Sequence, residues 1–570
     1  MQALTLKPDH WQALGALGRC LTGLCNYPEA LNAFSLALQA APTPYDNVDN
    51  LFHLGQLYKK IRHFEKALEC YDYILRMQPN HPETLIALSQ VYRQLGRTEQ
   101  AIEIHDRQLL LQPDNPSLLI SKALSLPVLY DSVEDVQTWR NTLAAQIDTL
   151  LQMEFPENRK LALHGSSFYL AYQGLNDRVL AEKIGRIFQK FLPSMAPVHL
   201  KPVGKPRIGI ISRFLSPQHT VGRFMQGIIE HLSRDYFEII TFSVGNDHAY
   251  LPQQKKHPND RIVVLPSDNI ETAARQILEH QPDLLLYADI GMNVTTYCLA
   301  GLRLAPVQCV TWGHPVTSGL STIDYFISSH LVEQEAEIAR THYSEKVVLL
   351  NTLPTYYYRP PFQTEKQNRS DFGLPETANL YVCPQSLFKF HPDFDPVLAA
   401  ILRQDPQGAL VLISHYTEAV NEQLRARWAK TMPDVLSRVH FLPRLERQQF
   451  LTLLQGATVI LDPLHFGGGN TTYEALGLGV PVVTCPGPYM RGRVTAGCYQ
   501  KMGLSTFIAQ TTDEYIALAF KWGTQPEQRS AASQQIMENQ SVLFEDPQVI
   551  EELEAFFKSV LSKNDAQQTL

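Results

Sequence analysis

A stretch near the C-terminal end, Leu461 to Gly487, constrains the fold more than any other part of the chain. It reads LDPLHFGGGNTTYEALGLGVPVVTCPG. The apolar, β-branched run that leads into it predicts a buried strand. The three glycines that follow permit positive φ, and a helix should start at Asn470 with a hydroxyl or amide at its N-cap. That helix should stop by Gly479, and Pro481 should open the next strand.

A strand, a glycine loop and a helix N-terminus together can bind phosphate without a metal, because free backbone N–H groups and the helix dipole favour an anion. The alternative is an ordinary turn between a strand and a helix of a parallel sheet. The spacing matches neither GxxxxGK[ST] nor GxGxxG, which disfavours a P-loop nucleotidase and a dinucleotide-binding enzyme.

Length and composition exclude several classes of protein. The chain has 570 residues, enough for three or more domains, and its net charge of −8 with no basic block disfavours a nucleic-acid partner. No apolar stretch approaches about 18–20 residues, so no membrane span is expected, and the N-terminus lacks the apolar core of a secretory signal. The eight cysteines contain no CxxC pair, which favours a reducing cytoplasm and disfavours a structural zinc.

The first third of the chain is repetitive. Turn signals begin at Pro79 and at Pro113, 34 residues apart, which is the tetratricopeptide period. Each unit predicts two helices with apolar positions at helical spacing, and we expect Leu54 and Tyr71 in the core. Stacked helix pairs leave a concave face that commonly binds peptides. The repeats therefore predict a solenoid that binds a protein partner, and a homo-oligomer formed through them is left open.

After Pro206 the pattern changes to short apolar runs separated by helical segments. This alternation predicts two α/β domains, each with a parallel sheet. The expected strands are RIGIISRF, FEIITFSVG, RIVVLP, DLLLYADI, APVQCVTWG and DYFISS, and then LYVCPQ, ALVLIS, RVHFLP, TVILDPL, PVVTCPG and STFIA.

The expected boundaries follow from these changes of pattern. They are 1–125 for the solenoid, 126–202 for a helical connector, 203–355 for the first α/β domain, 356–377 for a Pro-rich crossing, and 378–560 for the second α/β domain with closing helices. Ligands in open parallel sheets bind beyond the carboxyl ends of the strands, so the glycine loop should face a cleft between the two domains.

Several stretches carry a family resemblance. They include RIGIISRFLSPQHTVGRFMQ, LAPVQCVTWGHPVTSG, PQSLFKFHPDFDPVLAAIL and the glycine stretch through RGRV. In their order and spacing the chain resembles the bacterial branch of the O-GlcNAc transferase and SPINDLY family. The resemblance implies a GT-B fold and an inverting transfer of a sugar, GlcNAc from UDP-GlcNAc, to Ser or Thr of a protein, with no metal or other cofactor.

Metal-free transfer needs a cation near the leaving diphosphate, beside a helix N-terminus. Lys389, in QSLFKFHP, is the candidate, and the matching family lysine binds the diphosphate. By the same resemblance Gln385 contacts the nucleotide, Thr471 and Thr472 bind phosphate, and Asn470 lies near the sugar. The alternatives are a solvated loop lysine and threonines that only cap the helix.

The resemblance also assigns residues around these positions. Gly468 and Gly469 belong to the donor loop, and Glu474 could accept hydrogen bonds from the ribose, although the family carboxylate lies one position later. His219 is the candidate base, since an imidazole suits proton abstraction near neutral pH. A role that only orients the acceptor is the alternative. The loop GHPVTSG should line the sugar and acceptor pocket through Gly313, His314, Pro315 and Thr317.

Two alternatives stay open. Where animal members of the family place a histidine near the nucleotide base, this chain has Phe450 or a neighbour. The donor could therefore be GDP-fucose, as in the SPINDLY branch, or the chain could be an inactive repeat scaffold. Asp393 and Asp395 form a DxD pair by count, which marks metal-dependent GT-A enzymes, but their place at an apparent helix start indicates capping instead.

Overall fold

The computed structural model describes residues 7–155, 167–193, 195, 204–245, 257–361 and 369–568. These residues divide into two compact units, one ending at Val128 and the other formed by the described residues from Leu129 onward. No helix among the described residues is long and apolar enough to cross a membrane.

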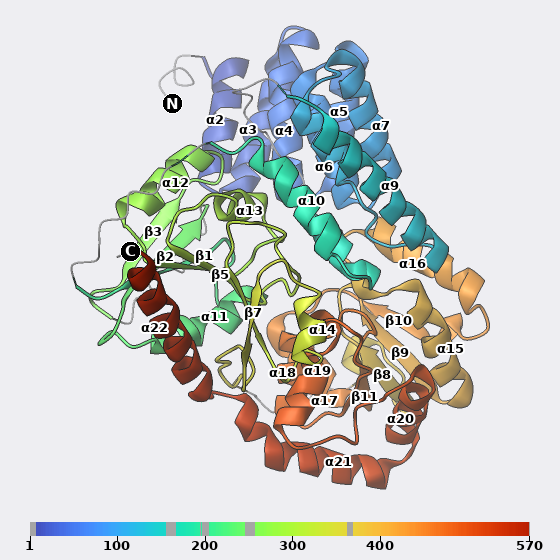
Figure 1. Cartoon of the computed structure of the whole chain (residues 1–570). Coiled ribbons are helices and arrows are strands. Elements are labelled where there is room, and N and C mark those ends of the chain that lie inside the picture. The colour runs from blue at the N-terminus through green and yellow to red at the C-terminus, as the bar shows by residue number, and fades with distance from the viewer. Residues whose placement is uncertain are drawn as a thin grey trace. The chain divides into compact units, whose positions relative to one another are not determined.

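The first unit consists of antiparallel helix pairs, as the 34-residue period predicts. Its helices are α2 (Trp11–Gly23), α3 (Tyr27–Ala40), α4 (Val48–Lys60), α5 (Phe64–Met77), α6 (Pro82–Gln94), α7 (Thr98–Leu111) and α8 (Pro116–Ala123), and Figure 1 labels α2 to α7. Polar side chains cap the start of three of them, because His10, His81 and Asn115 each accept a hydrogen bond from a backbone N–H of the first turn. The repeat-start signals in the sequence are therefore helix caps.

The interior of this unit needs small residues where helices meet. Phe34, Leu57 and Tyr71 are fully buried, and Leu54 is nearly so. A Cβ on Gly55 would lie 2.5 Å from the Tyr71 ring, so glycine gives the ring its space.

The second unit begins with helices that precede the first sheet. They are α9 (Val133–Gln152), the 3₁₀ segment η2 (Phe168–Gln173) and α10 (Arg178–Gln189). Ser132 caps α9 by accepting a hydrogen bond from Asp135 N at 3.1 Å, as the sequence predicts.

The first α/β half contains a sheet of seven parallel strands in the order β3-β2-β1-β4-β5-β6-β7. They are β1 (Arg207–Ser212), β2 (Glu238–Val244), β3 (Arg261–Leu265), β4 (Leu284–Tyr287), β5 (Val307–Val310), β6 (Tyr325–Ser329) and β7 (Lys346–Leu350). The sequence analysis missed β7 as a strand, because its partly exposed side chains stand at the sheet edge. The helices of this half are α11 (Thr220–His231), α12 (Ile270–Glu279), α13 (Val294–Ala300) and α14 (Ala336–Arg340).

The second half contains a five-stranded parallel sheet in the order β10-β9-β8-β11-β12. Its strands are β8 (Asn379–Cys383), β9 (Gly408–Ile413), β10 (Val439–Leu442), β11 (Val459–Leu461) and β12 (Val482–Val483). The stretch STFIA was predicted as a further strand. That prediction was wrong, because Ile508 makes only an isolated bridge to Thr484.

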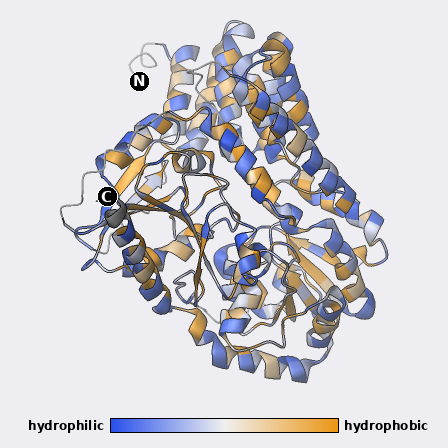
Figure 2. Cartoon of the chain, in the orientation of Figure 1, coloured by the Kyte–Doolittle hydropathy of each residue, from blue (hydrophilic) through white to orange (hydrophobic). Residues whose placement is uncertain are grey.

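Helices surround the second sheet and return to the first. They are α15 (Asp395–Gln404), α16 (Glu418–Thr431), α17 (Arg447–Gly456), α18 (Asn470–Gly477), α19 (Val494–Lys501), α20 (Thr512–Thr524), α21 (Pro526–Asn539) and α22 (Gln548–Gln568). Val549, Leu553 and Phe557 of α22 join the core of the first half. Figure 2 shows the strands coloured mainly as hydrophobic, as expected for sheets covered on both faces.

The strand orders locate the candidate sites. In the first sheet the order reverses between β1 and β4, and in the second between β8 and β11. Adjacent parallel strands whose connections leave toward opposite sides open a crevice at their carboxyl ends. The loop bearing Lys389 follows β8 and the glycine loop follows β11, so both predicted donor segments leave the second sheet at its reversal point.

Candidate functional site

The two loops at the second reversal point are joined by direct hydrogen bonds. Lys389 Nζ donates to Gln385 Oε1 at 2.7 Å and to the carbonyl oxygen of Gly467 at 2.7 Å. Gln385 Nε2 donates to Thr471 Oγ1 at 2.6 Å. The lysine, the glutamine and the threonine, which are up to 86 residues apart, therefore meet at one place.

Gly468 lies at the centre of this group. A Cβ built on it would come within 2.4 Å of Thr472 Oγ1, 2.7 Å of Thr471 Oγ1 and 3.0 Å of Gln385 Nε2. A side chain at this position would thus displace the polar groups, and the glycine is required for close approach rather than for an unusual φ.

The start of α18 differs from the expected cap. Gly469 occupies the N-cap position, and no side chain makes a capping hydrogen bond. The prediction of a hydroxyl or amide cap was wrong, because the threonine hydroxyls bond to Gln385 and to Thr495 instead. Among the described residues, no acceptor meets the backbone N–H of Asn470 or Thr471, and the buried Oδ1 of Asn470 has no partner. This helix start therefore presents donors that an anion can satisfy.

Asp462, which the sequence analysis did not single out, organises the glycine loop. It follows β11 and is buried, and it accepts hydrogen bonds from Gly468 N at 2.6 Å and from Thr484 Oγ1 at 2.9 Å. Burial raises the pKa of Asp462, while these donors, Thr495 and the nearby lysine lower it. An aspartate directly after a buried strand was the available signal.

The electrostatic state of Lys389 is unusual for a lysine. Burial lowers its pKa to about 8, and the negative charge of Asp462 acts in the opposite direction. Its ammonium lies 4.8 Å from the centroid of the Phe466 ring, and Tyr172 stacks on that ring with centroids 4.6 Å apart. The cation is therefore held between a carbonyl, an amide and an aromatic face.

Glu474 meets arginines where a ribose was predicted. Its Oε1 accepts from Arg447 at 2.7 Å and from Arg223 at 3.0 Å, and only 3% of its side chain is exposed. Arg223 belongs to α11 in the first half, so this ion pair joins the two α/β halves. In this structure two guanidinium groups hold the carboxylate, and contact with a ribose would require Glu474 to reach it through Oε2 or to exchange partners.

His219 lies in the loop after β1, where it caps α11. Its Nδ1 accepts a hydrogen bond from Val221 N at 3.3 Å, and its ring stacks on Phe214 with centroids 4.3 Å apart. When Nδ1 accepts, the proton of a neutral imidazole is on Nε2. His219 in this state donates through Nε2, which matches the orienting role better than the role of base.

The loop after β5 packs tightly beneath α11. A Cβ on Gly313 would lie 1.9 Å from the Ala288 carbonyl oxygen and 3.3 Å from Val221. Next to it Trp312 stacks on Phe224, with ring centroids 4.5 Å apart. A Cβ on Gly469 would lie 3.1 Å from the same Phe224 ring, so this loop and the glycine loop approach one α11 side chain from opposite halves.

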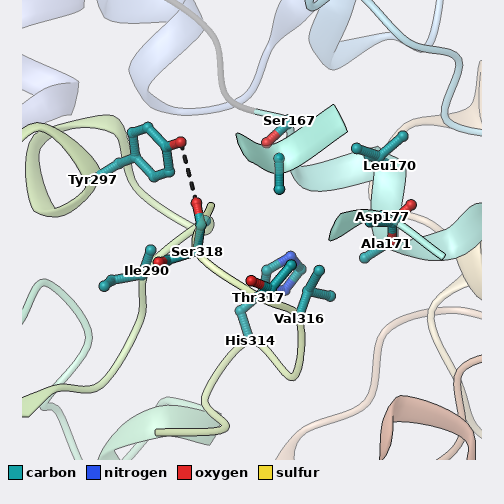
Figure 3. Close-up of a pocket in the computed structure, with 12 residues that line it drawn as sticks. Ser167, Leu170, Ala171, Asp177, Ile290, Tyr297, His314, Val316, Thr317 and Ser318 are labelled. Carbon is teal, nitrogen blue, oxygen red and sulfur yellow. Dashed lines mark hydrogen bonds between the residues drawn. The ribbon is translucent and has the colours of Figure 1, made fainter. Parts of the chain in front are cut away.

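His314 and Thr317 turn away from that contact toward η2. Both line a cavity of about 20 Å³, shown in Figure 3, which is large enough for about one water molecule and too small for a sugar. Burial lowers the pKa of His314 to about 3, and the positive charge of Arg491 adds to the effect. Thr317 Oγ1 donates to Glu345 Oε2 at 2.7 Å, and Pro315 lines a neighbouring cavity.

The predicted residues therefore form three groups. Gln385, Lys389, Gly468, Thr471 and Thr472 are brought together directly. His219 and Gly313 lie at the ends of β1 and β5 in the facing half, whereas His314, Pro315 and Thr317 line small buried cavities on another side of the loop.

A tetratricopeptide unit followed by two parallel-sheet halves, with a glycine loop and a helix start that lacks a side-chain cap in the second half, defines a repeat-bearing protein of the GT-B glycosyltransferase class. The sequence profile of glycosyl transferase family 41 matches residues 179–358 and 359–553, and a tetratricopeptide profile matches residues 62–123. The chain belongs to glycosyl transferase family 41.

The chain matches only part of the length of similar proteins. The chain is 24% identical over 398 residues to a probable UDP-N-acetylglucosamine–peptide N-acetylglucosaminyltransferase SEC of Arabidopsis thaliana, covering 66% of this chain and 37% of that protein. It is 24% identical over 343 residues to the UDP-glucose:protein N-β-glucosyltransferase of Actinobacillus pleuropneumoniae, covering 57% and 53%. The chain thus spans about a third to a half of these relatives.

A solved structure resembles nearly the whole chain. It is that of a mutant of the Thermobaculum terrenum O-GlcNAc transferase, with a TM-score of 0.73, 21% identity and 98% of each chain covered. At this identity the likeness confirms the fold, namely the repeats followed by the two α/β halves.

Proposed function

We propose that this protein is an inverting protein O-glycosyltransferase that moves GlcNAc from UDP-GlcNAc to Ser or Thr hydroxyls without a metal ion. The observation that carries the proposal is the meeting of Lys389, Gln385 and Thr471 at an uncapped helix start. Membership of family 41 supplies the reaction class.

On the donor side, the chain's own groups meet the charge of the leaving diphosphate. Lys389 provides the cation, and the N–H groups of Asn470 and Thr471 provide donors whose positions are set before the substrate arrives. The Thr471 and Thr472 hydroxyls can turn from Gln385 and Thr495 to phosphate oxygens. The free Oδ1 of Asn470 can accept a hydrogen bond from a sugar hydroxyl.

On the acceptor side, the hydroxyl oxygen attacks the anomeric carbon from the face opposite the diphosphate. The new C–O bond forms as the bond to the phosphate oxygen breaks, its electron pair leaves with the diphosphate, and the hydroxyl proton passes to a base. We infer that His219 orients the acceptor hydroxyl. It serves as the base only if Nδ1 takes the proton instead of accepting from Val221.

The repeats support a protein acceptor as the partner. We infer that the peptide is guided by the concave face of the helix pairs, since such solenoids commonly bind extended segments. The eight cysteines are all unpaired in the structure, which supports a reducing cytoplasmic setting.

Two measurements test the proposal. Calorimetry with UDP-GlcNAc, UDP-glucose and GDP-fucose identifies the donor, and mass spectrometry of acceptor proteins detects the added sugar. Lys389→Ala should lower turnover by about 10²–10³, the usual effect of losing one group that stabilises developing charge, whereas Lys430→Ala on the exposed face of α16 should not. Unchanged turnover in Lys389→Ala, or transfer to asparagine alone, would contradict the proposal.

A further inference from the structure

Two histidines from different loops converge on one carboxylate beside the donor residues. His391 Nδ1 lies 2.7 Å from Asp393 Oδ1, and His465 Nε2 lies 2.6 Å from Asp393 Oδ2. His391 and Asp393 belong to the loop after β8, and His465 belongs to the loop after β11. The nitrogen of each ring and a carboxylate oxygen all lie within 4.8 Å of one another.

The surroundings of this His391–Asp393–His465 cluster differ from those of an ordinary ion pair. Within the described parts of the chain, the ion-pair partners of Asp393 are these two histidines, and no lysine or arginine nitrogen lies within 4.0 Å of its carboxylate. Asp395, the other member of the DxD pair, is instead buried against Arg427. The Asp393 side chain is 38% exposed and that of His465 23%, so an ion can reach the cluster from solvent.

We propose that His391, Asp393 and His465 bind a divalent transition-metal ion such as zinc. Two imidazole nitrogens and one carboxylate oxygen are ligands that zinc and its neighbours prefer, whereas calcium and magnesium prefer oxygen alone. Three protein ligands leave a fourth position for water.

Binding requires the three side chains to rearrange. Ligands about 2.0–2.1 Å from a tetrahedral ion stand roughly 3.3 Å from one another. Each nitrogen must therefore move away from the carboxylate oxygen that it now contacts at 2.6–2.7 Å, and ligand atoms that are now up to 4.8 Å apart must approach to about that distance. An ion bound at His391 Nδ1 or His465 Nε2 must replace any proton that this nitrogen carries toward Asp393, and that proton moves to the other ring nitrogen or is released.

The cluster joins the loop after β8 to the loop after β11, so a bound ion would restrain both loops. His391 follows Lys389 by two residues, and His465 precedes Gly467 by two, while Lys389 Nζ already bonds to the Gly467 carbonyl. An ion held by both loops would restrain the segments that carry the proposed donor residues without contacting the donor. The inference does not depend on the proposed function, because ion binding can be measured whether or not the protein transfers a sugar.

The experiment uses the full chain freed of metal by a chelator. Zn²⁺ is titrated by calorimetry and Co²⁺ by visible absorption, and we expect one ion per chain with the d–d bands of a low-coordinate nitrogen and oxygen site. His465→Gln and Asp393→Asn should each weaken binding by roughly 100-fold or more, because losing a ligand should cost at least as much as the 10–100-fold that losing a group which only supports a ligand costs. His440→Gln, on β10 outside the cluster, controls for adventitious binding to surface histidines.

Two outcomes would overturn the proposal. One is the absence of a stoichiometric Zn²⁺ or Co²⁺ site in the wild-type chain. The other is binding that His465→Gln and Asp393→Asn leave unchanged, which would make the cluster a hydrogen-bonded clamp only. Asp393→Asn keeps the shape of the side chain, so it should remain folded, and its melting temperature without metal checks this. If the variant is unfolded, His391→Gln takes its place.

Discussion

The affinity for the donor diphosphate should depend on pH through Lys389. Burial lowers the pKa of this lysine from 10.5 to about 8, a shift that corresponds to roughly 3 kcal/mol against the charged form. A bound diphosphate would favour the ammonium again and raise its pKa. Binding above pH 8 must therefore be accompanied by uptake of one proton.

The sign and size of the effect follow from this linkage. Below pH 8 the free protein already carries the ammonium, so the dissociation constant should be nearly independent of pH. Above pH 8 it should rise about tenfold per pH unit, or about 1.4 kcal/mol, until the pKa of the bound state is reached. The dissociation constant for UDP should thus be about tenfold larger at pH 9 than at pH 7.5.

Calorimetry with UDP between pH 7 and pH 9, in buffers of different ionisation enthalpy, measures both the slope and the proton uptake. Lys389→Arg is the matched control, because a guanidinium stays protonated throughout this range. It should bind UDP with no slope. The reasoning fails if the wild-type slope is flat, or if the arginine variant shows the same slope.

Four further predictions concern other parts of the second unit. Glu474→Gln should lower the free energy of unfolding by about 1–3 kcal/mol in chemical denaturation, since two arginines lose their carboxylate; no change would mean that the ion pair between the halves contributes nothing. Gly313→Ala should lower the melting temperature because its Cβ would lie 1.9 Å from a carbonyl oxygen, whereas Gly456→Ala, with nothing within 4 Å, should not. Burial raises the pKa of Asp289 to about 6, so between pH 4 and pH 6 the folded state holds a proton that the unfolded state has lost. The free energy of unfolding should therefore fall as the pH rises from 4 to 6, relative to that of Asp289→Asn. His219→Gln should reduce turnover only modestly if the residue orients the acceptor, whereas a loss of about 10²–10⁴ in a pH–rate series would identify it as the base.

Local sequence signals predicted most secondary structure because their causes are local. The 34-residue period corresponds to helix pairs α4–α5 and α6–α7, and the β-branched runs correspond to strands β1–β6 and β8–β12. The strand β7 was missed and STFIA was overpredicted, since an edge strand and a short buried segment differ in their partners rather than in their own residues.

The glycine loop shows which features a sequence motif can predict and which it cannot. Its sequence predicted a strand, a turn and a helix start, and the resemblance to the family assigned Lys389 and Gln385 to the same site. The predicted side-chain cap was wrong, because the threonine hydroxyls form hydrogen bonds with residues 23 and 86 positions away in sequence. Local propensity can predict that a hydroxyl is available but not which distant donor will reach it.

By itself, the sequence determined the repeats, the two parallel sheets, and the loops that bear Lys389 and the glycine-rich start of α18. Only the tertiary structure decided that Arg223 from one half holds Glu474 of the other, that Asp462 supports Gly468, and that His391 and His465 share Asp393. The physical reason is that strand order places the ends of β8 and β11 side by side. Segments that are remote in the chain then share one electrostatic environment, and no periodicity or motif in either segment encodes its partner.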